Sequence, residues 1–322
     1  MGIKLPIGIE SFSEIRTGGY YYADKTQLIK QLLDASYKVN LITRPRQFGK
    51  TLAMSMLADF FDIRKNSENI FKGLFISEEK ELYHANRNQW PVLFVSFKDI
   101  EGLSFSSACK YLEMLIFDLC VEHEYLLQSE HVSQFDKVLF EKMTKREATI
   151  EELSNGLFLL TRMLYQNYGR QVILLIDEYD VPLSKANDYG YYQEMLSVIR
   201  TMFSKALKTN PYLKCAVLTG CLRVSKESIF TGVNNFAVDT VLDNRYRECF
   251  GFEDDDVRGL LRQCNLSDHY TQMKLWYDGY HFGEIDVYCP WDVINYCGDL
   301  LADSSSQPKD YWQNTSDGQL FC

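Results

Sequence analysis

The feature that most constrains the fold is a direct succession of an apolar run, a short loop and an amphipathic segment. Residues 39–43 (Val-Asn-Leu-Ile-Thr) predict a buried strand, and the apolar stripe of residues 52–61 predicts a helix packed on a sheet. The loop between them reads Arg-Pro-Arg-Gln-Phe-Gly-Lys-Thr, from Arg44 to Thr51. A strand, a loop ending in Gly-Lys-Thr and a helix are typical of a phosphate-binding loop, or Walker A motif. The segment therefore predicts an α/β fold with an anion site at the start of the helix.

Each part of this loop has an expected role. The N-terminus of the helix offers unpaired N–H groups and the positive end of its dipole to an anion. Lys50 is expected to reach the outer phosphates of a nucleotide, and the Thr51 hydroxyl to ligate Mg²⁺. The backbone of the preceding loop is expected to line the same phosphates, which assigns cofactor binding to Arg46, Gln47, Phe48 and Gly49. The motif is incomplete, because Arg44 stands where its first glycine usually lies.

A second signal lies far along the chain, at residues 172–180. The run 172–176 (Val-Ile-Leu-Leu-Ile) is typical of a parallel strand buried on both faces, and it ends in Asp177 and Glu178. An acid at the carboxyl end of such a strand points into the crevice where open α/β sheets bind ligands. Asp177 is therefore expected to hold the metal, as a Walker B acid, and Glu178 to polarise the attacking water. The alternative is that both acids only cap the next segment.

Strands and helices alternate through about residue 245, which predicts a three-layer fold with a parallel sheet. Further strands are expected over 91–97, 214–220 and 236–242, and helices over 106–123, 149–168 and 191–207. After Phe252 the pattern changes to short helical pieces and aromatic turns. We expect an ATPase-type core over residues 1–252, with an N-terminal extension over 1–36, and a smaller, mainly helical lid over 253–322. The sequence ends without a stop signal, so a further domain is expected beyond it.

Composition restricts the class of protein and its partners. The net charge of −10 argues against a surface built for nucleic acid or for an anionic membrane. No apolar run is long enough to span a bilayer, and no signal peptide is recognisable. The nine cysteines contain no Cys-x-x-Cys pair. We therefore expect reduced thiols, no zinc site and a cytoplasmic location.

Several segments together resemble the bacterial family of AAA-ATPase-like proteins, whose members often carry a C-terminal nuclease-like domain of the PD-(D/E)XK type. The resemblance rests on these two motifs and on Leu5–Gly8, Tyr22–Thr26, Leu218–Gly220, Lys226–Phe230, Asn234–Asn235, Trp276–Tyr280 and Pro290–Trp291. No nuclease constellation is visible in the present sequence. The resemblance implies a P-loop NTPase of the ASCE/AAA-like type with a helical lid, and ATP and Mg²⁺ as its ligands.

The resemblance also assigns candidate roles to residues outside the two motifs. Thr219, at the end of a predicted strand, falls where a polar sensor of the terminal phosphate lies, although a plain turn residue is an equal alternative. Arg223 is a candidate arginine finger, and a structural pairing with Glu227 is the favoured alternative. Arg44 and Arg46 are expected to contact phosphates, with solvated loop charges as the alternative. Arginine at position 44 is implied to be a trait of the family.

These observations leave three functions open. The first is an ATPase that hydrolyses ATP with Mg²⁺ to drive a conformational change in a partner or an attached domain. The second is a nucleotide-dependent switch or scaffold without efficient hydrolysis, linked to a nuclease-like domain or a nucleic-acid-processing partner. The third is a small-molecule kinase. The pair Asp177 and Glu178 argues against a kinase, because a kinase must exclude water as the acceptor of the phosphoryl group. A protein partner or a homo-oligomer fits the first two.

Overall fold

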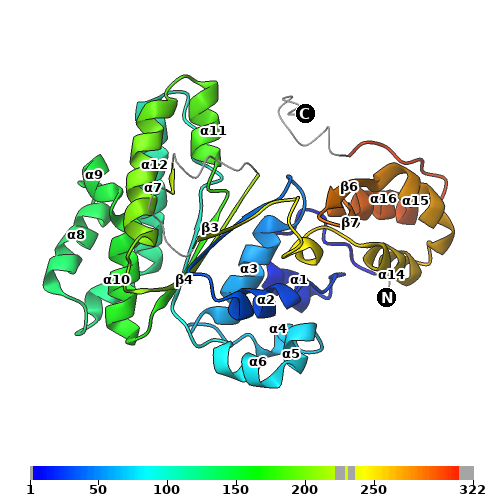
Figure 1. The fold of residues 1–322 in the computed structure, drawn as a ribbon, viewed down its shortest axis with the longest axis horizontal. Coiled ribbons are helices and arrows are strands. Elements are labelled where there is room, and N and C mark those ends of the chain that lie inside the picture. The colour runs from blue at the N-terminus through cyan, green and yellow to red at the C-terminus, as the bar shows by residue number, and fades with distance from the viewer. Residues whose placement is uncertain (1–2, 222–228, 231–235, 312–322) are drawn as a thin grey trace.

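A five-stranded parallel sheet forms the centre of the molecule (Figure 1). The computed structural model describes residues 3–221, 229–230 and 236–311. The strand order is β2-β3-β4-β1-β5, and every neighbouring pair is parallel. The strands are β1 (Val39–Thr43), β2 (Val92–Ser96), β3 (Val172–Asp177), β4 (Leu213–Gly220) and β5 (Phe236–Asp239). The predicted α/β class and the parallel sheet are confirmed.

Both faces of the sheet are covered, as the continuous apolar runs predicted. All six residues of β3 are buried, and they alternate between two separate cores. Leu174 and Ile176 belong to the core on one face, whereas Ile173 and Leu175 belong to the core on the other. This alternation follows from the two-residue period of a strand. It leaves Asp177, the last residue, at the carboxyl edge of the sheet.

Two layers of helices enclose the sheet (Figure 1). One face is covered by α7 (Phe105–Glu122), α10 (Gly156–Tyr168), α11 (Val181–Asp188) and α12 (Tyr192–Leu207), with η1 (Glu124–Gln128), α8 (Gln134–Thr144) and α9 (Ile150–Leu153) outside them. The other face carries α1 (Phe12–Gly18), α2 (Gln27–Ala35), α3 (Lys50–Phe61), α4 (Glu68–Phe71), α5 (Phe75–Glu78) and α6 (Lys80–Asn86). The helix expected over 149–168 is divided, because the chain bends at Ser154–Asn155 between α9 and α10.

The C-terminal part of the described chain shares a third core with Tyr21 and Ala23, and it contains a hairpin that the sequence did not predict. It follows η2 (Arg247–Cys249) and comprises α14 (Asp254–Cys264), η3 (Ser267–His269), α15 (Tyr270–Tyr277), β6 (Asp278–Phe282), β7 (Ile285–Tyr288) and α16 (Pro290–Ala302). Strands β6 and β7 are antiparallel, whereas the sequence predicted short helical pieces and aromatic turns in this region. The boundary at residue 252 and the function of this part as a lid stay predictions.

The N-terminal segment joins this C-terminal part to the sheet. Lys25 forms an ion pair with Asp256 of α14 at 2.6 Å, and the Tyr21 hydroxyl donates to the Asp256 carbonyl oxygen at 3.1 Å. Tyr21 also packs edge-on against Phe252. These contacts attach residues 21–25 to Phe252 and to the start of α14.

The carboxyl end of β4 requires a glycine. A Cβ atom on Gly220 would collide with the Asp180 carboxylate and lie 2.6 Å from the Tyr179 ring. The Tyr179 amide donates to the Thr219 carbonyl oxygen at 3.1 Å, so the chain after β3 lies directly against β4. The absence of a side chain at Gly220 permits this close approach.

We therefore expect Gly220→Ala to lower the free energy of unfolding by about 1–3 kcal/mol through overpacking. Gly259→Ala is the matched control, because the nearest atom to its Cβ is Arg262 Nη2 at 4.0 Å and the position lies inside α14. That control should be neutral or stabilising by about 0.5–1 kcal/mol. Urea unfolding of both variants measures the difference, and equal stability would contradict the close approach.

Candidate functional site

The loop after β1 presents the N-terminus of α3 to a cavity. Gly49 is the N-cap residue with φ of 79°, and Gln47 also has a positive φ of 69°. These left-handed conformations turn the chain sharply between β1 and α3. Within the described chain no side chain caps α3. Its first N–H groups are therefore placed to receive an anion, as the sequence predicted for a phosphate-binding loop.

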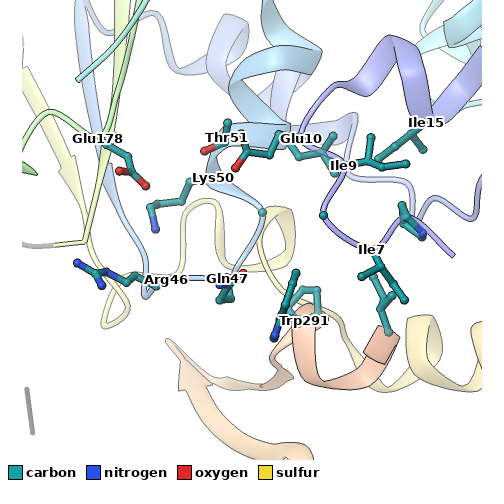
Figure 2. A pocket seen from close by; sticks show the side chains of 16 residues that line it. Ile7, Ile9, Glu10, Ile15, Arg46, Gln47, Lys50, Thr51, Glu178 and Trp291 are labelled. Carbon is teal, nitrogen blue, oxygen red and sulfur yellow. The ribbon is translucent and has the colours of Figure 1, made fainter. Parts of the chain in front are cut away.

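The Lys50 side chain folds back over its own loop. It is buried, and its Nζ donates to the Pro45 carbonyl oxygen at 2.8 Å and lies 3.4 Å from Cys221 Sγ. Figure 2 shows Lys50 projecting into the pocket between Glu178 and Arg46. The ammonium group is thus held at the loop, where a phosphate oxygen could replace the carbonyl oxygen as its acceptor.

Asp177 joins the two motifs. Its carboxylate is buried and accepts a hydrogen bond from the Thr51 hydroxyl at 2.8 Å and another from the Thr219 hydroxyl at 2.6 Å. The strand order explains this meeting, because β4 lies between β1 and β3 and all three carboxyl ends share one edge. The sequence prediction that the two motifs converge agrees with these hydrogen bonds.

Glu178 lies beside this network in an unusual backbone conformation. Its φ of 53° is in the left-handed region, which residues with a side chain seldom adopt. Partial burial raises the pKa of its carboxyl group, the charge of Asp177 raises that pKa further, and Lys50 opposes the shift. Backbone strain and a shifted pKa in a cavity are features that concentrate at functional sites.

A cavity of about 270 Å³ lies beside Lys50, Thr51 and Glu178 (Figure 2). Its other lining residues are residues 6–10 with Ile15, the loop residues Arg46, Gln47, Gly49 and Leu52, and, at the start of α16, Pro290, Trp291 and Ile294. No local pattern in the sequence predicts α16 at this site. Residues 5–8 and Pro290 contribute to the family resemblance, and that resemblance implies nothing about a cavity wall.

A second, more apolar cavity of about 90 Å³ adjoins the first. The two share six lining residues, which are Pro6, Ile15, Gly49, Leu52, Pro290 and Ile294. Tyr21, Tyr22, Met56 and Phe252 line the second cavity alone. The loop 46–51 therefore lies between the larger cavity, which Lys50 and Glu178 line, and a smaller, more apolar one.

Two of the predicted loop residues point away from the cavity. Arg44 was expected to contact phosphate, but its guanidinium is fully buried and forms an ion pair with Asp239 at 2.6 Å. The Phe48 ring is buried against Tyr280 and Phe282, and Phe48 lines the second, more apolar cavity but not the larger one. The expectation for Arg44 is corrected by this burial.

The remaining predicted residues differ in their position relative to the cavity. Arg46 is exposed, and with Gln47 it lines the cavity. Thr219 donates to Asp177 and is buried, so it acts on the site through that carboxylate. Arg223 lies outside the described residues.

Comparison with known proteins now assigns the family. A family model described as "Predicted AAA-ATPase" (AAA-ATPase-like) matches residues 6–230. The chain belongs to this family. The matched region of this AAA-ATPase-like chain includes the phosphate-binding loop and the acid pair. Membership confirms the resemblance inferred from the sequence, and it supports ATP binding by a P-loop NTPase in general terms.

A curated relative extends the likeness along the chain. An uncharacterized protein in the vnfD 5' region of Azotobacter chroococcum mcd 1 is 28% identical over 314 residues. The alignment covers 97% of this chain and 54% of the relative, so the chain spans about half the length of that protein. Among the described residues, no helix is long and apolar enough to cross a membrane.

The Asp177 network generates a stability prediction. Thr219→Val removes a donor from a buried carboxylate without changing the shape of the side chain. We expect it to lower the free energy of unfolding by about 1–3 kcal/mol in the absence of nucleotide. Thr201→Val is the control, because the Thr201 hydroxyl donates to a carbonyl oxygen on the exposed surface of α12. Equal effects of the two substitutions in denaturant unfolding would contradict a structural role for this hydrogen bond.

Proposed function

We propose that this AAA-ATPase-like chain binds ATP with Mg²⁺ and hydrolyses it to drive a conformational change in a partner or an attached domain. The observation that carries the proposal is the hydrogen bond from Thr51 to Asp177. It brings the phosphate-binding loop and the strand-end acid to one point beside the cavity. Both are needed for a nucleotide and its metal ion to be held together.

The phosphates would occupy the larger cavity at the start of α3, beside Lys50. The N–H groups of the first helical turn and Lys50 would neutralise the β and γ phosphates, and the exposed Arg46 side chain is within the same cavity wall. Binding would draw Lys50 away from the Pro45 carbonyl oxygen. The base would enter the adjoining apolar cavity, where Tyr21 and Tyr22 offer aromatic surface next to the loop.

The oxygen atoms of Thr51 and Asp177 suit Mg²⁺, which prefers hydroxyl, carboxylate, phosphate and water oxygens. The hydroxyl and the carboxylate are already 2.8 Å apart. When bound there, the ion would neutralise charge on the phosphates. Thr219 would hold the second carboxylate oxygen of Asp177 in place.

Glu178 is the group best placed to orient a water molecule for in-line attack on the γ-phosphate. It lines the cavity together with Lys50 and Thr51. Its ionised form would accept a proton from that water. The strained backbone at Glu178 aims the carboxylate into the cavity, away from the strand.

A nucleotide-dependent switch without efficient hydrolysis is the second candidate. The observation that favours it is the engagement of Lys50 with its own loop, which nucleotide binding would release. The same contact change could alter the surface presented to a partner. Negligible turnover with a nucleotide-dependent change in oligomer size would support the switch.

Two variants separate binding from hydrolysis. Lys50→Ala should weaken Mg-ATP binding about 10- to 100-fold, because it removes a charge-assisted hydrogen bond to phosphate. Glu178→Gln should bind Mg-ATP like the wild type and lose turnover by about 10²–10⁴-fold. Calorimetric titration and phosphate release measure the two effects.

The exposed residues Lys145 and Glu141 of one surface ion pair provide matched controls, as Lys145→Ala and Glu141→Gln. Both should leave binding and turnover unchanged. If Lys50→Ala binds Mg-ATP with wild-type affinity, the loop is not the nucleotide-binding site. If Glu178→Gln keeps wild-type turnover, Glu178 is not the general base.

The raised pKa of Glu178 predicts that the rate of ATP hydrolysis falls on the acid side of its pH profile. A general base acts in its ionised form, and a pKa above the ordinary glutamate value means that this form is lost at a higher pH. The value of kcat/KM, which reports groups of the free protein, should therefore fall as the pH is lowered through the raised pKa. Nucleotide affinity measured at each pH serves as the control. A rate that stays flat until the ordinary glutamate range would contradict this account.

A further inference from the structure

The arginine that replaces the first glycine of the phosphate-binding loop is fully buried. Its Nη2 contacts Asp239 Oδ2 at 2.6 Å, and its Nη1 donates to the Thr43 carbonyl oxygen at 2.9 Å. Among the described residues, Arg44 Nε and Asp239 Oδ1 have no hydrogen-bond partner. The pair is therefore a charged and incompletely satisfied group inside the protein.

This pair fixes the point where the loop leaves the sheet. The Arg44 amide donates to the Gly220 carbonyl oxygen at 3.1 Å, which extends the pairing of β1 with β4. Asp239 ends β5 on the opposite side of β1, in register with Ile42. The first loop residue is consequently tied to both neighbouring strands.

Aromatic rings of the C-terminal part enclose the guanidinium. The centroids of the Phe250 and Phe282 rings each lie 5.2 Å from Arg44 Cζ. Phe282 also packs against Phe48, with ring centroids 5.2 Å apart, and Phe48 contacts Tyr280 at 4.7 Å. The loop thus rests on strand β6 through Arg44 at its start and through Phe48 near its end.

Stability alone does not account for a buried pair of this kind. Removing two charges from water is unfavourable, and apolar residues of similar volume often replace a buried ion pair without loss of stability. Burial raises the pKa of Asp239, whereas Arg44 lowers it, so the arginine opposes protonation of the carboxylate. A directional bond that fixes the loop is a better explanation than a gain in stability.

We propose that Arg44 and Asp239 are positioning residues that hold the phosphate-binding loop in its nucleotide-binding shape against strand β6. This inference rests on the proposed binding of nucleotide at the same loop. It assigns Arg44 a role outside the cavity, where it sets the path of residues 45–49 without touching phosphate. It also makes the shape of the loop depend on the C-terminal hairpin.

The double variant Arg44→Met/Asp239→Leu tests this role, because it removes both charges together and leaves neither unpaired. We expect its melting temperature to stay close to that of the wild type, since burying such apolar replacements is often neutral. Its dissociation constant for Mg-ADP should rise at least about tenfold, because a displaced loop misplaces several phosphate donors at once. Calorimetric titration with Mg-ADP measures the affinity without turnover.

Arg162 and Asp136 form a second, less deeply buried arginine–aspartate pair between α10 and α8, away from the cavity. Arg162→Met/Asp136→Leu is therefore the matched control and should bind Mg-ADP like the wild type. A fall in affinity in both double variants would assign the effect to general destabilisation and overturn the inference.

Arg44→Leu/Asp239→Val provides a second test if the first double variant does not fold, because it also removes both charges and places smaller apolar side chains in the core. Either double variant, if it folds and binds Mg-ADP within about twofold of the wild-type affinity, would overturn this inference and leave the proposed function standing. Failure of the wild type to bind Mg-ADP would overturn the proposed function, and this inference with it.

Discussion

The hydrogen bond between the Thr51 hydroxyl and the Asp177 carboxylate is the interaction on which the rest of the site depends. It joins the start of α3 to the end of β3, two elements far apart in the sequence. The bond is possible because β1, β4 and β3 are adjacent and parallel, so that their carboxyl ends share an edge. Thr219, from the central strand of these three, completes the coordination of the same carboxylate.

The site is not made by the sheet alone. Residues 6–10 and the start of α16 form the walls of the main cavity, and both come from outside the strand–helix alternation. The C-terminal hairpin supports the phosphate-binding loop from behind through Phe282. A movement of the C-terminal part would therefore change both the walls of the cavity and the support of the loop, which gives nucleotide binding a physical connection to that part.

The sequence predicted the elements that local periodicity defines. The strand expected over 39–43 and the helix ending at Phe61 are found with those limits. The meeting of Thr51 with Asp177 was also predictable, because the ends of parallel strands follow a general rule. The burial of the Arg44 side chain was not predictable from the sequence. It depends on Asp239, Phe250 and Phe282, which lie about 200 residues away and give no local signal. The hairpin of β6 and β7 lacks a clear strand signal, because its strands are short and rich in aromatic residues with a glycine.

A crystal structure with Mg²⁺ and a non-hydrolysable ATP analogue tests the central claim most directly. The account predicts phosphates at the N-terminus of α3, Lys50 Nζ transferred from the Pro45 carbonyl oxygen to a phosphate oxygen, and the metal beside Thr51 and Asp177. It also predicts the base next to Tyr22, with Arg44 still on Asp239. A nucleotide bound elsewhere, with Lys50 still on Pro45 and the cavity beside Glu178 unchanged, would contradict it.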